Sequence, residues 1–485
     1  MNHVAFKLLL GAAVLLIGCN DSNAPEVVTT ETAPPSSPLR LLVVEDPELA
    51  QAIVRVWSSR STVPLELIES AEHDFVTELE STDLQINADA IIYPTRLLGS
   101  LAESDLIAPM PARIQGNEQL AMDDMFPLIR SRELRWGATL YAVPFGSPHL
   151  SFVYRSDVFE QLDLRPPTTW QELADLSRQL STPEVRSSLR GLVEETTAVL
   201  TQPLAAGSAG ATFLARAAPL VVHPGRYSAI FDFRTMQPLI GQPPFVQALE
   251  AMVADHQHGS QADLTMTPAL AASAVAAGRS IMAIGWVVAA LDGDTSDDDE
   301  KFHSVSFAEM PGSTMVYSPS TQAWEPRDRE SMFRVPLLGT SGRVGSVLRR
   351  SRRERDAWNL LVLLSGVEWG LEISPSSRHT SIARPTQATS VGKWLDERLG
   401  PEAIESYSRV VTASQSRRAS LFVPRLPGHD RYMQALDTAV RTTLAGDVTA
   451  KSALQTASLR WNEITDEMGR DRQARAYQRS LGLVP

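Results

Sequence analysis

The chain has 485 residues, of which 43% are hydrophobic and 21% are charged. This balance is typical of globular proteins and excludes collagen-like, coiled-coil and wholly disordered chains. Lys+Arg 44 against Asp+Glu 57 gives a formal net charge of −13, whereas nucleic-acid binders usually carry a basic excess. At about 150 residues per domain, the length predicts two or three domains, and the charge predicts no nucleic-acid partner.

The first segment is typical of a secretory signal. Lys7 precedes an apolar run from Leu8 to Ile17, which is too short to span a bilayer comfortably. The run leads to Gly18 and to Cys19, the only cysteine of the chain. This ending resembles the lipobox of bacterial lipoproteins, which are cut before the cysteine and acylated on it. The resemblance implies a signal peptide over 1–18 and a membrane anchor on Cys19; a plain signal peptide with an incidental cysteine is the alternative.

Residues 19–38 are predicted to form a flexible tether after a lipidated Cys19. They are rich in Ser, Thr, Pro and acids and show no apolar period, a composition that favours an extended, mobile connection. No later segment approaches eighteen consecutive apolar residues, so no second membrane crossing is expected.

Strand and helix patterns alternate from Leu39 onwards. Continuous apolar runs predict strands, and apolar residues at helical spacing predict helices, in the order strand 39–44, helix 47–58, strand 64–68, helix 75–84 and strand 88–92. This alternation is typical of a parallel α/β sheet.

Ligands of such sheets bind beyond the carboxyl ends of the strands. Glu45 and Asp46 follow the first predicted strand, and Tyr93 and Thr95 end the third. All four are therefore candidate ligand-binding residues.

The segment 141–180, YAVPFGSPHLSFVYRSDVFEQLDLRPPTTWQELADLSRQL, predicts two strands, a short helix and a capped helix from Trp170 to Leu180. It resembles family 1 extracellular solute-binding proteins of bacterial ABC importers, the maltose-binding type. Members carry Tyr-x-Val-Pro and, further on, Pro-x-Thr-Trp-x-Glu-Leu. Other landmarks follow in family order, including AGRSIMAIGW at 277–286 and LGTSG at 338–342. The resemblance covers essentially all of residues 39–469.

This resemblance implies an α/β fold of the periplasmic-binding-protein type II, with two lobes, each a mixed sheet flanked by helices. The hinge would be crossed three times, near Gly146, Pro311 and Pro385. Lobe 1 would hold 39–146 and 312–385, and lobe 2 would hold 147–311 and 386–485. The sequence departs from the family pattern in an acidic loop at 292–300 and a lengthened region at 317–330, whose roles stay open.

Two lobes that close on a solute must bring contacts together from both sides. The further candidate binding residues are Phe145 and Ser147 beside the first crossing, His149 just beyond it, Trp286 where family members often place a sugar-stacking aromatic, and Thr340 and Ser341 in a Gly-rich turn. Each of these residues has a structural alternative, such as hinge packing or a core position.

The sequence contains no His-Glu-x-x-His, Walker A or Gly-x-Ser-x-Gly motif, so no metal, cofactor or catalytic residue is expected. The resemblance implies a monomeric lipid-anchored extracytoplasmic receptor that delivers a small solute, most often a carbohydrate, to ABC permease subunits. Two alternatives stay open. One is a solute sensor for a membrane signalling protein, and the other is a secreted glycoside hydrolase that uses Glu45 or Asp46 with a second acid.

Overall fold

The computed structural model describes residues 37–79, 84, 86–257, 261–286, 302–327 and 334–483. Pro38–Pro485 forms one compact unit. The predictions for the signal peptide, for Cys19 and for the tether up to residue 36 lie outside the described residues, as does the acidic loop at 292–300.

The first sheet has five strands in the order β2-β1-β3-β14-β6. β1 pairs in parallel with β2 and β3, whereas β14 is antiparallel to β3 and to β6. The bounds are β1 Leu39–Val44, β2 Leu65–Ser70, β3 Ala90–Pro94, β6 Val143–Gly146 and β14 Arg343–Val347. Because β14 runs against β1 and β3, its first residues lie at the edge where those two strands end.

The second sheet has four strands in the order β10-β7-β9-β8. β7 is antiparallel to β10 and β9, and β8 is parallel to β9. The bounds are β7 Ser151–Arg155, β8 Ala198–Thr201, β9 Ser280–Gly285 and β10 Val305–Glu309. Both main sheets are therefore mixed, as the family resemblance implied.

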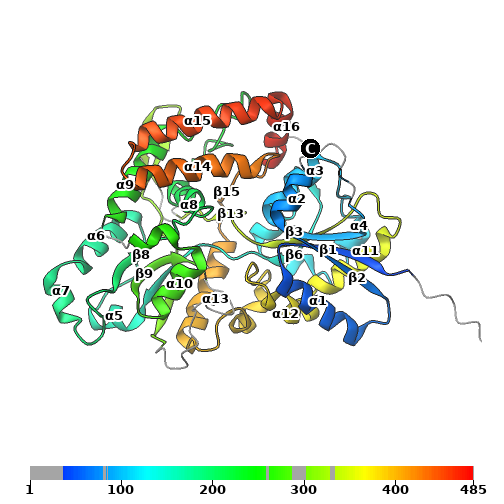
Figure 1. The fold of residues 1–485 in the computed structure, drawn as a ribbon, viewed down its shortest axis with the longest axis horizontal. Coiled ribbons are helices and arrows are strands. Elements are labelled where there is room, and N and C mark those ends of the chain that lie inside the picture. The colour runs from blue at the N-terminus through cyan, green and yellow to red at the C-terminus, as the bar shows by residue number, and fades with distance from the viewer. Residues whose placement is uncertain are drawn as a thin grey trace, which may run out of the picture. The chain divides into compact units, whose positions relative to one another are not determined.

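Helices flank both sheets (Figure 1). Beside the first sheet are α1 Pro47–Arg60, α2 Glu72–Leu79, α3 Leu98–Glu103, α4 Ala112–Gln115, α11 Glu354–Ser365 and α12 Val367–Ile373. The other helices are α5 Ser156–Gln161, α6 Trp170–Leu180, α7 Pro183–Ser188, α8 Ala209–Val221, α9 Pro243–His256, α10 Pro268–Ala276, α13 Pro401–Gln415, α14 His429–Leu444, α15 Ala450–Glu467 and α16 Arg470–Ser480. Among them, α10 packs on β9, α13 packs on β10, and α8 packs on both α9 and α14.

The helix starts follow from local sequence. Asp46 begins α1, where its Oδ1 accepts a hydrogen bond from the Leu49 amide at 3.1 Å. Thr169 begins α6 in the same way, accepting from the Glu172 amide at 3.0 Å, while the Glu172 carboxylate accepts from the Thr168 amide at 2.6 Å. Such caps satisfy amides that have no partner inside the helix.

The chain leaves the first sheet at Gly146, the end of β6, and enters the second at Ser151, the start of β7. Gly146 has a φ of +101°, and a Cβ atom there would lie 1.7 Å from the carbonyl oxygen of Ser381. Only glycine tolerates both the backbone angle and the contact. The first passage between the sheets therefore lies directly against residue 381.

The chain returns to the first sheet later than the lobe boundary predicted at residue 312. The Gly312 amide donates to the Thr168 carbonyl at 2.8 Å. A hairpin of β11 Met315–Ser318 and β12 Ala323–Pro326 packs on α8, and β13 Leu337–Leu338 pairs with β15 Leu421–Phe422. The chain therefore joins the five-stranded sheet only at Arg343, because the lengthened segment forms its own contacts with helices beyond the first passage.

Candidate functional site

A cavity of about 290 Å³, here called the cleft cavity, takes its lining from elements of both sheets. Two larger cavities, of about 720 and 570 Å³, contain no residue of the five-stranded sheet or of its helices. The cleft cavity is lined by Glu45, Glu72, Arg96, Leu150, Gly207, Ser208, Ala211, Thr212, Thr267, Pro268, Trp286, Thr340, Ser341, Arg343 and His379.

The five-stranded sheet supplies most of the charged lining. Glu45 follows β1 and Arg96 follows β3, while Thr340 and Ser341 precede β14. Because β14 is antiparallel to β3, these residues meet at one edge of the sheet. This is the edge at which the sequence predicted ligand-binding residues.

The second sheet supplies the aromatic lining. Trp286 follows β9 and is partly exposed. Its backbone amide donates to the carbonyl of Pro268, the first residue of α10, at 3.3 Å. Ser208 and Thr212 join it from the start of α8. An indole face beside hydroxyl groups can cover an apolar surface and bond a polar rim.

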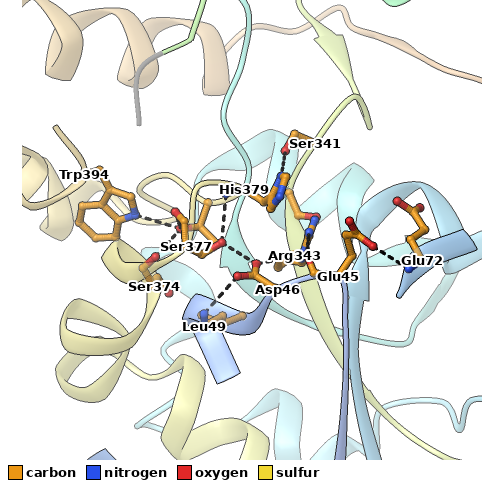
Figure 2. Close-up of polar contacts among 12 residues, drawn as sticks. Glu45, Asp46, Leu49, Glu72, Ser341, Arg343, Ser374, Ser377, His379 and Trp394 are labelled. Atoms are coloured by element: carbon orange, nitrogen blue, oxygen red, sulfur yellow. Dashed lines mark hydrogen bonds and ion pairs between the residues drawn. The ribbon is translucent and has the colours of Figure 1, made fainter. Parts of the chain in front are cut away.

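Asp46 is buried and fully engaged within the protein (Figure 2). Besides capping α1, its carboxylate accepts a hydrogen bond from the Ser377 hydroxyl at 2.5 Å and lies 3.0 Å from Arg343 Nε. Burial raises the pKa of Asp46, while Arg343 and Ser377 oppose that rise. The carboxylate does not line the cleft cavity, contrary to the prediction from its position, because it stabilises the floor of the site.

Glu45 is exposed and lines the cleft cavity. Its Oε2 accepts a hydrogen bond from the Glu72 amide at 2.7 Å, and its backbone carbonyl accepts from Arg343 at 2.7 Å. Glu72 in turn forms an ion pair with Arg96. Burial raises the pKa of Glu72, and the charge of Arg96 opposes that rise.

Arg343 and His379 complete this wall (Figure 2). Burial lowers the pKa of Arg343 to about 10, with Asp46 opposing, so the guanidinium stays charged at pH 7. Burial and then the charge of Arg343 lower the pKa of His379 to about 3, so this imidazole is neutral. Its Nδ1 lies 3.5 Å from the Ser341 hydroxyl. The wall thus combines paired charges with neutral hydrogen-bonding groups.

Four of the predicted binding residues line the cleft cavity, namely Glu45, Trp286, Thr340 and Ser341. Sequence reasoning missed Glu72, Arg96, Arg343 and His379. Arg343 directly follows the Gly-rich turn that was selected, and Arg96 directly follows the selected Thr95. Both arginines would have been found if each candidate loop had been extended by one residue towards its C-terminal side.

Three predicted residues are core side chains instead. The Tyr93 hydroxyl bonds the Ser346 hydroxyl at 2.8 Å inside the first sheet, and burial raises its pKa. Phe145 is only 1% exposed and packs beside Gly345. His149 contacts Gln415, and burial lowers its pKa to about 4. None of the three lines the cleft cavity, because Tyr93 in β3, Phe145 in β6 and His149 in the connection from β6 to β7 are all buried in the interior.

Thr95 and Ser147 are also buried and surround Gly342. A Cβ atom on Gly342, whose φ is +113°, would lie 2.1 Å from the Ser147 hydroxyl and 2.6 Å from that of Thr95. Ser147 donates to the buried Glu133 carboxylate at 2.7 Å. Contrary to the prediction, these two hydroxyls support the turn behind the cavity wall and do not line it.

The described ranges of the chain hold no group of three or more His, Cys, Asp or Glu side chains placed to bind a metal ion. No helix within them combines the length and apolar character needed to cross a membrane.

Two mixed sheets with a lined cavity at their adjoining edges define a two-lobe α/β binding protein of the periplasmic-binding-protein fold. Residues 69–315, slightly more than half of the chain, match the family of bacterial extracellular solute-binding proteins. The chain belongs to that family. Its members bind solutes and are not enzymes, which confirms the expectation of a non-catalytic protein and disfavours the hydrolase alternative.

One curated relative and several solved structures resemble the chain. A mannitol-binding protein of Pseudomonas aeruginosa is 32% identical over 95 residues, which cover 19% of this chain and only 20% of that protein. A solute-binding protein of Agrobacterium radiobacter K84 in complex with ribitol has a TM-score of 0.62 at 16% identity, covering 88% of this chain and 99% of its own.

Two further structures show the same likeness. A solute-binding protein of Agrobacterium vitis S4 with bound D-mannitol has a TM-score of 0.61 at 14% identity, with 89% of this chain and 99% of that chain covered. A maltose-bound protein of T. maritima has a TM-score of 0.59 at 14% identity, with 88% and 100% covered. At these identities the likeness establishes the fold.

Proposed function

We propose that this protein captures a neutral sugar or polyol in the cleft cavity and delivers it to an ABC importer. The observation that carries the proposal is that one cavity draws its lining from both sheets. A solute held there contacts both halves, and its binding energy therefore favours the closed arrangement. The three predicted hinge crossings fit such a closure.

The chemistry of the lining favours an uncharged, hydroxyl-rich solute. Arg343 is paired with Asp46, and Arg96 is paired with Glu72, so neither arginine is left to bind an acidic group. The Glu45 carboxylate and the hydroxyls of Thr340 and Ser341 can bond solute hydroxyls. The Trp286 ring can cover the C–H face that sugars and polyols share.

The size of the cavity favours a single sugar or a short polyol. Its volume of about 290 Å³ is just below the roughly 300–1,000 Å³ typical of ligand pockets. The named relatives support the class, since ribitol and D-mannitol occupy two proteins of the same fold and a matching segment comes from a mannitol-binding protein.

The location of the protein forms the second part of the proposal. The apolar run before Cys19 and the lipobox-like ending support acylation of Cys19 after cleavage. Acyl chains on Cys19 would hold the binding protein at the extracytoplasmic face of a bacterial membrane, beside the permease subunits that receive the solute.

A thermal-shift panel tests the solute class. A ligand that binds only the native state stabilises it by RT ln(1 + [L]/Kd), so ribitol, D-mannitol, D-tagatose and maltose should separate into stabilising and inert compounds. Glucose 6-phosphate and a mixture of amino acids serve as charged comparisons. Stabilisation by the charged compounds alone, with no response to any neutral sugar or polyol, would contradict the proposal.

A further inference from the structure

A smaller cavity, of about 80 Å³ and here called the arginine cavity, shares no lining residue with the cleft cavity. It lies between the end of α8, residues 222–230, β15 and α16. Arg132, Arg226 and Arg425 all line it, and none of its described lining residues is acidic. Its volume exceeds the roughly 10–15 Å³ that a cavity needs to hold one water molecule.

Arg425 is the most buried of the three, at 3% exposure. Its guanidinium carbon lies 3.8 Å from the centroid of the Phe422 ring. Two of its nitrogens donate to the carbonyls of Glu133 and Arg132, at 3.3 and 3.2 Å. The third nitrogen, Nε, is buried and has no hydrogen-bond partner among the described residues. An unpartnered buried donor is costly.

Arg132 and Arg226 have no carboxylate partner within ion-pair distance among the described residues. Arg132 stands close enough to Arg425 to repel it. Burial lowers the pKa of Arg425 to about 9, and the charge of Arg132 adds to that lowering. The geometry thus places three like charges around one space; the Asp232 carboxylate, which interacts with the charge of Arg226, does not line the cavity.

Other titratable groups beside these arginines do not compensate their positive charge. Burial raises the pKa of Glu133 to about 7, with the Ser147 hydroxyl and the charge of Arg425 opposing, so this carboxyl is only partly ionised at neutral pH. His223 lines the cavity, but its Nε2 lies 3.1 Å from the Glu325 carboxylate. Tyr93 also faces Arg425 and stays neutral.

We propose that the arginine cavity binds a small tetrahedral oxyanion, a free phosphate or sulfate ion, between Arg132, Arg226 and Arg425. Guanidinium groups match the geometry of such anions and form charge-assisted hydrogen bonds with them. An anion there would supply a partner for the free Nε of Arg425 and offset the repulsion between the arginines.

The position gives the anion a structural role. Arg132 precedes the first passage between the sheets at Gly146, whereas Arg226 and Arg425 follow it. The Glu103 carboxylate, which also precedes this passage, lies 2.7 Å from the guanidinium of Arg479, which follows it, and the two form an ion pair. A bound anion would therefore join segments that lie before and after the first passage, and would favour the arrangement in which they adjoin.

Calorimetric titration of the purified full-length protein with inorganic phosphate, and separately with sulfate, tests the site. Sodium chloride at equal ionic strength controls for screening. We expect saturable binding at one site, and about a tenfold or larger loss of affinity in Arg226→Gln and in Arg132→Gln. Arg472→Gln, an exposed arginine on α16 outside both cavities, is the matched control and should bind phosphate as the wild type does.

The alternative outcomes are distinct. Absence of saturable heat with both anions overturns the proposal, and so does an equal loss of affinity in Arg472→Gln. Far-UV circular dichroism shows whether each variant is folded. Trp286→Ala should keep the phosphate affinity, so failure of the sugar proposal and failure of the anion proposal are separable.

Discussion

Arg343 Nε lies 3.0 Å from Asp46 Oδ2, and both side chains are almost completely buried. The pair joins the start of α1 to the start of β14, two elements that are far apart in the sequence. Figure 2 shows the pair beside Glu45 and His379, two residues that line the cleft cavity. The ion pair therefore sets the position of the Gly-rich turn that carries Thr340 and Ser341.

Replacing Arg343 by methionine should destabilise the protein by about 3–5 kcal/mol, because it leaves the Asp46 carboxylate buried without its cation. Urea denaturation measures the change in the free energy of unfolding. Arg349→Met is the matched control, since Arg349 pairs with Asp105 at the exposed surface and such pairs contribute about 0–1 kcal/mol. Equal costs for the two variants would contradict the structural role of the buried pair.

His149 should make the protein less stable as the pH falls from 7 to 5. Burial lowers its pKa to about 4, so the folded state keeps it neutral while the unfolded state takes up a proton below about pH 6.5. The free energy of unfolding decreases as the pH falls wherever the unfolded state binds more protons than the folded state. His149→Gln should therefore lose about 2 kcal/mol less than the wild type over this range.

Denaturant titrations at several pH values measure this difference. Glu133, with a pKa of about 7, takes up a proton in the folded state and opposes the loss, but it does so equally in both proteins. His73→Gln, at an exposed position of α2, should follow the wild-type pH dependence. An unchanged slope in His149→Gln would show that the imidazole is not held neutral by burial.

Trp286→Ala should weaken the binding of any sugar or polyol identified by the thermal-shift panel by about tenfold or more, which corresponds to about 1.4 kcal/mol. The indole is the one large aromatic ring among the residues that line the cleft cavity. Trp369→Ala, a partly buried tryptophan that packs on Trp57 in α1, is the control. If affinity were unchanged in Trp286→Ala, the solute would bind elsewhere.

Cys19→Ser should move the protein expressed in a bacterium from the detergent-rich to the aqueous phase in detergent phase separation. The reason is that acyl chains contribute about 0.8 kcal/mol for each buried CH₂ group. Mass spectrometry of the N-terminal peptide measures the acylation directly. Aqueous partition of the wild-type protein, without any added acyl mass, would leave a plain signal peptide as the explanation.

Local patterns predicted the elements well. The strands expected at 39–44, 64–68 and 88–92 correspond to β1 at Leu39–Val44, β2 at Leu65–Ser70 and β3 at Ala90–Pro94. The predicted cap of α6 is also confirmed. These features depend on residues a few positions apart, so the sequence alone contains the information.

The cleft cavity depends on longer-range pairing, which a single sequence does not reveal. Asp46 appears at a strand end like a ligand-binding carboxylate, and only the fold brings Arg343 and Ser377 against it. The strand ending at Tyr93 is likewise correct, but the direction of its side chain depends on β14 as a neighbour. Strand ends could therefore be located from the sequence, whereas only some of the side chains that line the cleft cavity could be identified.

The most direct test of the central claim is calorimetric titration of the purified protein with D-mannitol and ribitol in phosphate-free buffer. The account predicts saturable binding of one molecule of at least one of these polyols per chain, with binding weakened by Trp286→Ala. Absence of binding by both polyols and by every neutral sugar of the panel, from a protein shown to be folded, would contradict it.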